Sequence, residues 1–247
     1  MTRAMRPLRG IAGVLPLVIV CATAIGTTVA AEQLVDPPRL LFAERPAVLV
    51  LIDGDPIYRP IEGTDLERIA NAKPFIVRDT AGIHYMSVFD GWMESYGLRG
   101  LWSVSGAPPP GGDEALQRVE ATDPVDLLDG RPARTSRGTP KLDDATAPEI
   151  VISTEPAELI VTDGPPRFAA VDGTSLEYVE NTTANIFKEP TDEELYVLIS
   201  GRWLRAWTTD GPWQVVARRD LPSDIQAIPD DSPVWHGARA TRAAERK

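Results

Sequence analysis

Downstream of residue 31, the chain consists mainly of short apolar runs separated by turn residues. The runs AVLVLI at residues 47–52 and ELIV at residues 158–161 are each followed within two residues by Asp-Gly, at Asp53-Gly54 and Asp163-Gly164. Runs of this kind predict strands, and Asp-Gly predicts the tight turns after them, because both residues tolerate a positive φ. No long helical periodicity is present in this part of the chain. The pattern predicts a mostly-β protein.

The apolar pattern occurs twice. Residues 46–66 match residues 156–176 at nine of 21 positions, at a constant offset of 110 and without a gap. With one more residue, an offset of 111 aligns three aromatic positions: Tyr85 with Tyr196, Trp92 with Trp203, and Trp102 with Trp213. Repetition at a fixed spacing indicates duplicated structural units. We therefore predict two copies of one β module, a divergent first copy at residues 39–120 and a second at residues 149–236.

The second copy shows the module most clearly. Residues 194–200, 202–207 and 212–216 predict a three-stranded antiparallel meander, with turns at Ser200-Gly201 and Asp210-Gly211. Alternation along the middle strand places Trp203, Arg205 and Trp207 on one face and Arg202, Leu204 and Ala206 on the other. Short helical segments are expected at residues 113–119 and from Ser223 until Pro229. Two tryptophans are thus expected on one side of the sheet.

The segments outside the modules have other compositions. Residues 121–148 are rich in Pro, Gly, Thr, Asp and Arg and carry few large apolar side chains, which predicts a linker or a loosely ordered loop. The basic, alanine-rich residues 237–247 predict a frayed tail. The expected architecture is two tandem antiparallel modules with short helical turns, joined by a linker.

The first 31 residues have the features of an export signal. Arg3, Arg6 and Arg9 precede an apolar run that ends in small residues, which predicts a secretory signal cleaved after Ala30 or Ala31. The run is also about long enough to span a bilayer, so an uncleaved membrane anchor is the alternative. Cleavage would place the protein in the periplasm or outside the cell. It would also remove Cys21, the only cysteine, and leave no disulfide or thiol chemistry.

Charge and residue types exclude several functions. The chain has 36 acidic and 25 basic residues, and removal of the signal leaves 22 basic residues. Such an acidic chain is a poor partner for nucleic acid, whose phosphates need clusters of Lys and Arg. The two histidines, His84 and His236, are expected to be solvated or hydrogen-bonded surface residues, and no spacing typical of zinc ligands is present. We expect no cofactor and no metal, although the acidic runs at Asp143-Asp144, residues 192–194 and Asp230-Asp231 have the oxygen ligands that calcium uses.

Motifs in the second copy resemble a known family. The stretches STEPAELIVTDGPP at residues 153–166, SGRWL at 200–204, DGPW at 210–213 and LPSDIQAIPDDSP at 221–233 resemble a repeated module of exported bacterial proteins, some of which are labelled carbohydrate-binding. PAVLVLIDGDPIYRPIEGTDL at residues 46–66 resembles a preceding repeat of the same family. The first copy departs from the pattern, with FDGW at residues 89–92 and GLW at 100–102.

Aromatic residues are the candidates for ligand contact. On a small sheet, tryptophan and tyrosine either form the core or offer an exposed platform on which sugar rings stack. The candidates are the aromatic residues of the two meanders: Trp203, Trp207, Trp213, Tyr196, Trp92 and Trp102. Core positions are favoured for Trp203 and Trp213, and Trp207, whose counterpart is Tyr96, is the best single candidate for ligand contact.

Three functions remain open at this point. The first is an exported non-catalytic binding module for envelope or extracellular polysaccharide. The second is a structural or protein-interaction repeat of the cell envelope. An enzyme is least favoured, because no nucleophile elbow or phosphate-binding loop is present, although glycoside hydrolysis needs only two carboxylates. No catalytic residue is therefore predicted.

Overall fold

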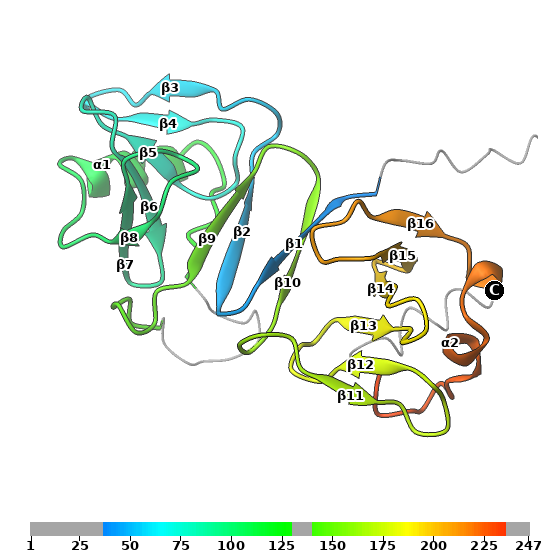
Figure 1. Cartoon of the computed structure of the whole chain (residues 1–247). Helices are drawn as coiled ribbons and strands as arrows, with labels where there is room; N and C mark the ends of the chain where they lie inside the picture. The colour runs from blue at the N-terminus through cyan, green and yellow to red at the C-terminus, as the bar shows by residue number, and fades with distance from the viewer. Residues whose placement is uncertain (1–36, 130–139, 236–247) are drawn as a thin grey trace, which may run out of the picture. The chain divides into compact units, whose positions relative to one another are not determined.

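The computed structural model describes residues 37–129 and 140–235 (Figure 1). The expected export signal at residues 1–31 and the expected tail at residues 237–247 lie outside the described residues, as does His236. None of the helices in the described part of the chain is long and apolar enough to cross a membrane.

Two six-stranded antiparallel sheets form the body of the protein, and the prediction of a mostly-β fold with two similar modules is confirmed at this level. In each sheet the strands follow one another in sequence order, as in a meander. The first sheet contains β3 (Tyr58–Pro60), β4 (Glu67–Ile69), β5 (Ile76–Arg78), β6 (His84–Val88), β7 (Gly91–Ser95) and β8 (Ser103–Val104). The second contains β11 (Phe168–Ala170), β12 (Glu177–Val179), β13 (Asn185–Lys188), β14 (Leu195–Ile199), β15 (Arg202–Ala206) and β16 (Gln214–Val216).

The sheets match strand for strand, and the extra residue of the second copy lies in the loop between β13 and β14. The predicted turn glycines have positive φ, 76° at Gly54, 78° at Gly164 and 81° at Gly211. Where the second copy turns at Ser200-Gly201, the first copy reverses at Phe89 and Asp90, because β7 already begins at Gly91, and Phe89 takes a positive φ of 54°. The three strands predicted over residues 194–216 are β14, β15 and β16, half of a larger sheet.

Four further strands pair across the two copies. The first strand of the first copy, β1 (Arg39–Ala43), runs parallel to β10 (Ala157–Val161) of the second copy. Correspondingly, β9 (Glu149–Ser153) runs parallel to β2 (Ala47–Leu51) of the first copy (Figure 1). Because β1 corresponds to β9 and β2 to β10 at the offset of 110, the copies exchange their first strands.

The hydrogen bonds of this exchange are reciprocal. The N–H of Arg39 donates to the carbonyl of Pro156 at 3.0 Å, and the equivalent N–H of Glu149 donates to the carbonyl of Pro46 at 2.8 Å. An interface in which equivalent residues make equivalent contacts in both directions is isologous, as in a two-fold symmetric dimer. The chain therefore contains, within one polypeptide, the kind of interface that normally joins two identical subunits.

As a result, the packed units differ from the sequence repeats. Residues 47–129 and 140–153 hold the first sheet and the ribbon β2·β9, and we call them the first lobe. Residues 37–43 and 157–235 hold the second sheet and the ribbon β1·β10, and we call them the second lobe. The lobes are joined by two connections of three residues, 44–46 and 154–156. The expected module boundaries at residues 39, 120, 149 and 236 thus do not coincide with the packing.

The described part of the expected linker belongs to the first lobe. Its few large apolar side chains are Val125, Leu127, Leu128 and Leu142, and all four pack in the clusters of that lobe. Leu142 is buried, and its N–H donates to Oδ1 of Asp90 at 2.7 Å. The sequence composition indicated little burial, but these four residues suffice to fasten residues 125–128 and 142 to the lobe.

Each sheet is covered on both faces. One face of the second sheet, with Phe187 and Trp203, packs against α2 (Ser223–Ala227) and Trp235, after the 3₁₀ turn η1 (Arg218–Asp220). The other face, with Leu204, packs against β1 and β10. In the first lobe, α1 (Gly112–Glu120) and the ribbon β2·β9 cover the two faces in the same way. Alternation along β15 therefore directs Trp203 into one core and Leu204 into the other.

Candidate functional site

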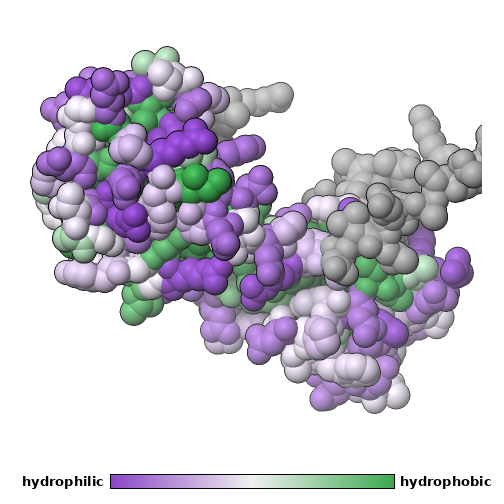
Figure 2. All heavy atoms as spheres, turned by 90° about the horizontal axis from the view of Figure 1, so that it is seen from above, coloured by the Kyte–Doolittle hydropathy of each residue, from purple (hydrophilic) through white to green (hydrophobic). Residues whose placement is uncertain are grey.

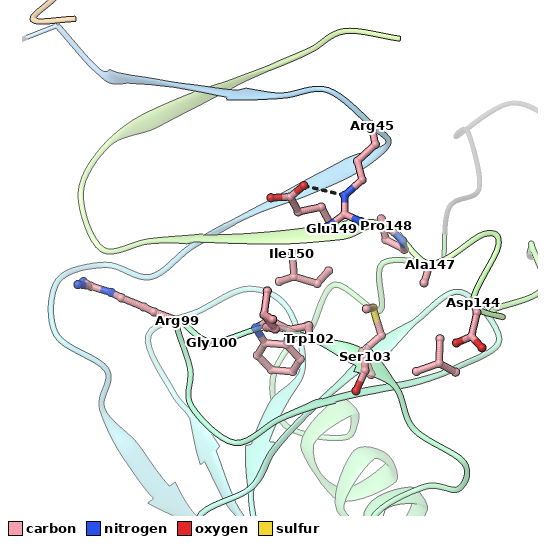
Figure 3. A pocket seen from close by; sticks show the side chains of 13 residues that line it. Arg45, Arg99, Gly100, Trp102, Ser103, Asp144, Ala147, Pro148, Glu149 and Ile150 are labelled. Atoms are coloured by element: carbon pink, nitrogen blue, oxygen red, sulfur yellow. Dashed lines mark hydrogen bonds and ion pairs between the residues drawn. The ribbon is translucent and has the colours of Figure 1, made fainter. Parts of the chain in front are cut away.

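Two grooves lie beside equivalent loops of the two sheets, and the second is also lined by Glu149 and Val151 of the first lobe. The first groove, with a volume of about 550 Å³, is lined by residues 99–104 and 147–150 together with Arg45, Met93 and Asp144 (Figure 3). The second groove, of about 490 Å³, is lined by residues 37–42, Glu149, Val151, and Thr209, Asp210, Pro212 and Trp213. Volumes in this range suit a small ligand or a few units of a polymer.

The equivalence of the grooves follows from the repeat. One wall comes from the loop between the last two strands of the sheet, which spans residues 96–102 in the first lobe and 207–213 in the second. Residues 99–102 of the first loop and Thr209, Asp210, Pro212 and Trp213 of the second line the grooves. The other wall is the segment that enters the ribbon, residues 147–150 in the first groove and 37–40 in the second. Duplication of the module has therefore duplicated the hollow along with the fold.

A half-buried tryptophan closes each loop. The indole N–H of Trp102 donates to the carbonyl of Leu98, and that of Trp213 donates to the carbonyl of Thr209, both at 3.2 Å. Trp213 also stacks on Phe42 of β1, with ring centroids 6.1 Å apart and an angle of 19° between the planes. The same hydrogen bond from an indole N–H to a carbonyl of its own loop therefore closes both loops.

Each of these loops begins with an exposed aromatic residue. The side chain of Trp207 is 69% exposed, and that of its counterpart Tyr96 is 85% exposed. Trp207 is exposed because β15 ends at Ala206, so the residue lies beyond the layers that cover the sheet. The first loop also carries Leu101, one of the scattered hydrophobic side chains on a surface that is otherwise largely hydrophilic (Figure 2).

The other predicted aromatic residues belong to the core. Trp203 is only 7% exposed and lies with its ring centroid 6.1 Å from that of Phe187 and 6.2 Å from that of Trp235. Trp92 is buried beside Phe75, and Tyr196 is buried in the same cluster as Trp203. Trp203 and Trp207 were expected on one side of the sheet, but only Trp203 lies in the strand. Trp207 is left as the exposed member of the predicted set.

Polar side chains line the rim of the first groove. Nε of Arg45 lies 2.9 Å from Oε2 of Glu149, and Arg99 donates to Oγ1 of Thr154 at 2.7 Å. Figure 3 shows Arg45 and Glu149 facing one another across the rim, with Ile150 between them and Trp102. Exposed ion pairs of this kind contribute little to stability. The hydroxyl groups of a ligand can therefore replace the present partners of Arg45, Glu149 or Arg99 at a small cost in free energy.

A buried carboxylate in the second lobe, that of Glu194, has a structural role. Tyr196 donates its hydroxyl to Oε2 of Glu194 at 2.6 Å, and Arg205 lies 3.6 Å from the same oxygen. Burial, followed by the hydrogen bond to Glu194, raises the pKa of Tyr196 above its usual range. The equivalent Tyr85 donates to Oδ2 of Asp79 at 3.4 Å. In both lobes the tyrosine thus ties down the loop that precedes its own strand, away from the grooves.

His84 is buried, contrary to the expected surface position. It is 6% exposed, and its Nε2 lies 2.8 Å from the hydroxyl of Tyr58, whereas Nδ1 has no hydrogen-bond partner among the described residues. Burial and the charge of Arg78 lower its pKa from 6.5, against the opposing charge of Asp79. Leu195 occupies the equivalent position in the second lobe, so this histidine fills a core position of the first lobe.

We expect the stability of the protein to fall in mild acid because of His84. Its folded-state pKa lies below the value of 6.5 for the free side chain, so protonation favours the unfolded chain. The contribution is fully present above about pH 6.5 and is lost as the pH falls from there through the folded-state pKa. Urea unfolding between pH 7.5 and pH 5 measures the loss, and His84→Leu should flatten it.

The matched control for that measurement is His236→Gln, which changes the only other histidine. This variant should keep the pH dependence of the parent protein. A His84→Leu protein whose stability still falls by the same amount between pH 7.5 and pH 5 would show that other groups cause the effect.

No group of three or more His, Cys, Asp or Glu side chains suited to hold a metal is found in residues 37–129 and 140–235. Of the acidic runs, Asp143 orders its own turn, since its Oδ1 accepts the N–H groups of Ala145 at 3.1 Å and Thr146 at 3.0 Å. Hydrogen bonds, first that from the Thr146 hydroxyl, lower the pKa of Asp143. This carboxylate therefore has a local role in a loop.

No protein-family model matches the chain, and no curated protein or solved structure was found to be similar to it. The arrangement of the two grooves and their loops therefore has to carry the functional argument by itself.

Proposed function

We propose that this protein is an exported, non-catalytic binding protein that holds polysaccharide of the cell envelope or the extracellular space at two equivalent grooves. The observation that supports this most is the repeated loop, which begins with an exposed aromatic residue, Tyr96 or Trp207, and ends with the tryptophan at the groove. Tyrosine and tryptophan are enriched at protein interfaces relative to the rest of the protein surface.

The chemistry of the loops and rims suits sugars. A sugar ring presents an apolar C–H face, which can stack on an aromatic ring, and hydroxyl groups around its edge, which need donors and acceptors. Trp207 and Tyr96 offer the exposed rings, and Arg45, Glu149 and Ser103 offer polar atoms at the first groove. Two such sites on one chain bind a repetitive polymer more tightly than either does alone, because the second contact is intramolecular.

Substitution of the exposed rings tests the proposal. We expect Trp207→Ala and Tyr96→Ala each to weaken retardation by a soluble polysaccharide by about tenfold or more, since loss of one of two linked contacts removes the avidity. The double variant should migrate as if no polysaccharide were present. Affinity electrophoresis over a panel of glycans, including soluble chitin and peptidoglycan fragments, is the measurement.

Phe168→Ala is the matched control, because Phe168 is an aromatic residue that is 41% exposed but lies in β11, outside the two loops. It should migrate as the parent protein does in every gel. Unretarded migration of the parent protein across the whole panel would overturn the proposed function.

A protein-interaction or structural role is the second candidate. It is favoured by the burial of Trp92, Tyr196 and Trp203, which turns half of the predicted ligand contacts into core. On this view the exposed loops contact an envelope protein. A pull-down from envelope extracts that recovers the same protein with the parent and loses it with the Tyr96→Ala/Trp207→Ala double variant would favour this role, and recovery of no partner would count against it.

Among the described residues that line the two grooves, no pair of acids is repeated at equivalent positions, which favours binding over catalysis. Glycoside hydrolysis uses a pair of carboxylates at a set separation. At the grooves the charges are reversed between equivalent positions: Glu149 corresponds to Arg39, and Arg99 to Asp210. An unchanged viscosity of any retarding polysaccharide after prolonged incubation with the protein is the expected result, and a fall in viscosity would contradict a non-catalytic role.

A further inference from the structure

The strand β1 belongs to the second lobe, although the first lobe separates it in sequence from the rest of that lobe. Its register partners all lie on β10, from Arg39 opposite Ala157 to Ala43 opposite Val161. Between these two strands the chain passes through the whole of the first lobe, residues 47–153. By contrast, both strands of the ribbon β2·β9 lie within one continuous lobe.

The second lobe needs β1 for its core. Leu40 is buried in the cluster that contains Ile160, Val197 and Leu204, and Phe42 packs against the same cluster and on Trp213. Without β1, these apolar side chains and the unpaired edge of β10 would face water. A free edge beside an apolar surface is a template for another strand.

The strand β1 is nevertheless attached to the second lobe by modest interactions. The strand has five residues, and among the described strands it is paired with β10 alone. It connects to the first lobe through Glu44, Arg45 and Pro46, all of which are exposed. A short strand on an exposed connection can leave its place without disturbing the first lobe.

We propose that the second lobe also accepts β1 from a second copy of this chain, so that two chains exchange β1 and form a closed dimer. The occupant is specified by the interface itself, because a β1 from another molecule makes the same register, the same contacts of Leu40 and Phe42, and the same hydrogen bonds. Exchange of an identical element between protomers needs no new contacts. The chain's own β1 competes at an effective concentration of about millimolar, so exchange rises with protein concentration.

Cysteine trapping between two tagged chains tests the exchange. Leu41 and Leu159 are register partners in β1·β10, and both are half-buried. In a Cys21→Ser background, one chain carries Leu41→Cys and the other, with a larger tag, carries Leu159→Cys. After the two are refolded together and oxidised, we expect a disulfide-linked heterodimer on a non-reducing gel, in an amount that increases with total protein concentration.

Two controls make either result decisive. A single chain with both Leu41→Cys and Leu159→Cys should form the disulfide within a monomer, which shows that the geometry permits the bond. The pair Leu49→Cys and Val151→Cys, register partners in β2·β9, should not link two chains, because both strands belong to one continuous lobe. Absence of the Leu41–Leu159 heterodimer at every concentration, or equal trapping of the β2·β9 pair, would overturn the proposal.

Discussion

Phe187→Ala should lower the free energy of unfolding by about 3–5 kcal/mol, the range for loss of a fully buried phenylalanine. Phe187 has no exposed surface, and its ring centroid lies 5.1 Å from that of Trp235 and 6.1 Å from that of Trp203. The cavity would open between the second sheet and the segment after α2. Urea unfolding followed by tryptophan fluorescence measures the loss and also reports on Trp203 and Trp235 directly.

The residue at the equivalent position of the first lobe provides a graded variant. Val77, also fully buried, stands where Phe187 stands, so Phe187→Val tests whether the second lobe can adopt the smaller side chain of its counterpart. We expect a smaller loss than for alanine, because less of the cavity remains. Phe168→Ala, at an exposed site, should change stability by less than about 0.5 kcal/mol. A Phe187→Ala protein as stable as the Phe168→Ala protein would contradict the layered core.

Local chemistry explains which parts of the fold could be predicted. The turn at Asp163-Gly164 follows from the conformational freedom of these residues, and the alternation along β15 follows from the geometry of a strand. The matching of Trp92 with Trp203 identified the two sheets. In each case the signal lies within a few residues of the structure that it specifies.

The pairing of the first strands could not be predicted in this way. The runs RLLFA of β1 and EIVIS of β9 are both short and apolar, so either could pair with β2 or with β10. Which strand each of them pairs with depends on the direction that the chain takes through the connections at residues 44–46 and 154–156. No local sequence pattern specifies that direction. The composition of residues 121–148 predicted a linker although Leu142 is buried. The burial of Leu142 depends on contacts with residues far away in the sequence, and composition does not record such contacts.

The candidate site, too, could be predicted only where the signal is local. Alternation placed Trp203 on one face of its strand, but only the structure shows that α2 and Trp235 cover that face. Trp207 is exposed because β15 ends one residue before it. His84 was missed as a core residue, since its burial depends on the hydroxyl of Tyr58, which lies 26 residues away in the chain. Whether an aromatic residue serves a core or a ligand is thus decided by the layer packed above it.

Leu40→Ala should destabilise the second lobe, although Leu40 belongs to the first copy of the repeat. The side chain is buried among Ile160, Val197 and Leu204, so its truncation should lower stability by about 2–5 kcal/mol. The loss of stability should be confined to the second lobe, because loosening β1 does not change the contacts within residues 47–153. Hydrogen–deuterium exchange resolved by peptide is the measurement, with faster exchange expected in β14 and β15 and unchanged exchange in β6 and β7.

The reciprocal variant makes this prediction specific to the crossed strands. Ile150 in β9 is the equivalent of Leu40 and packs on the first lobe, so Ile150→Ala should loosen β6 and β7 and leave β14 and β15 protected. If the copies were instead self-contained, the two patterns would be interchanged, with Leu40→Ala affecting the first sheet and Ile150→Ala the second. Because each peptide is compared with the same peptide of the parent protein, differences in intrinsic exchange rates cancel. The pair of patterns therefore reports directly on which lobe each first strand completes.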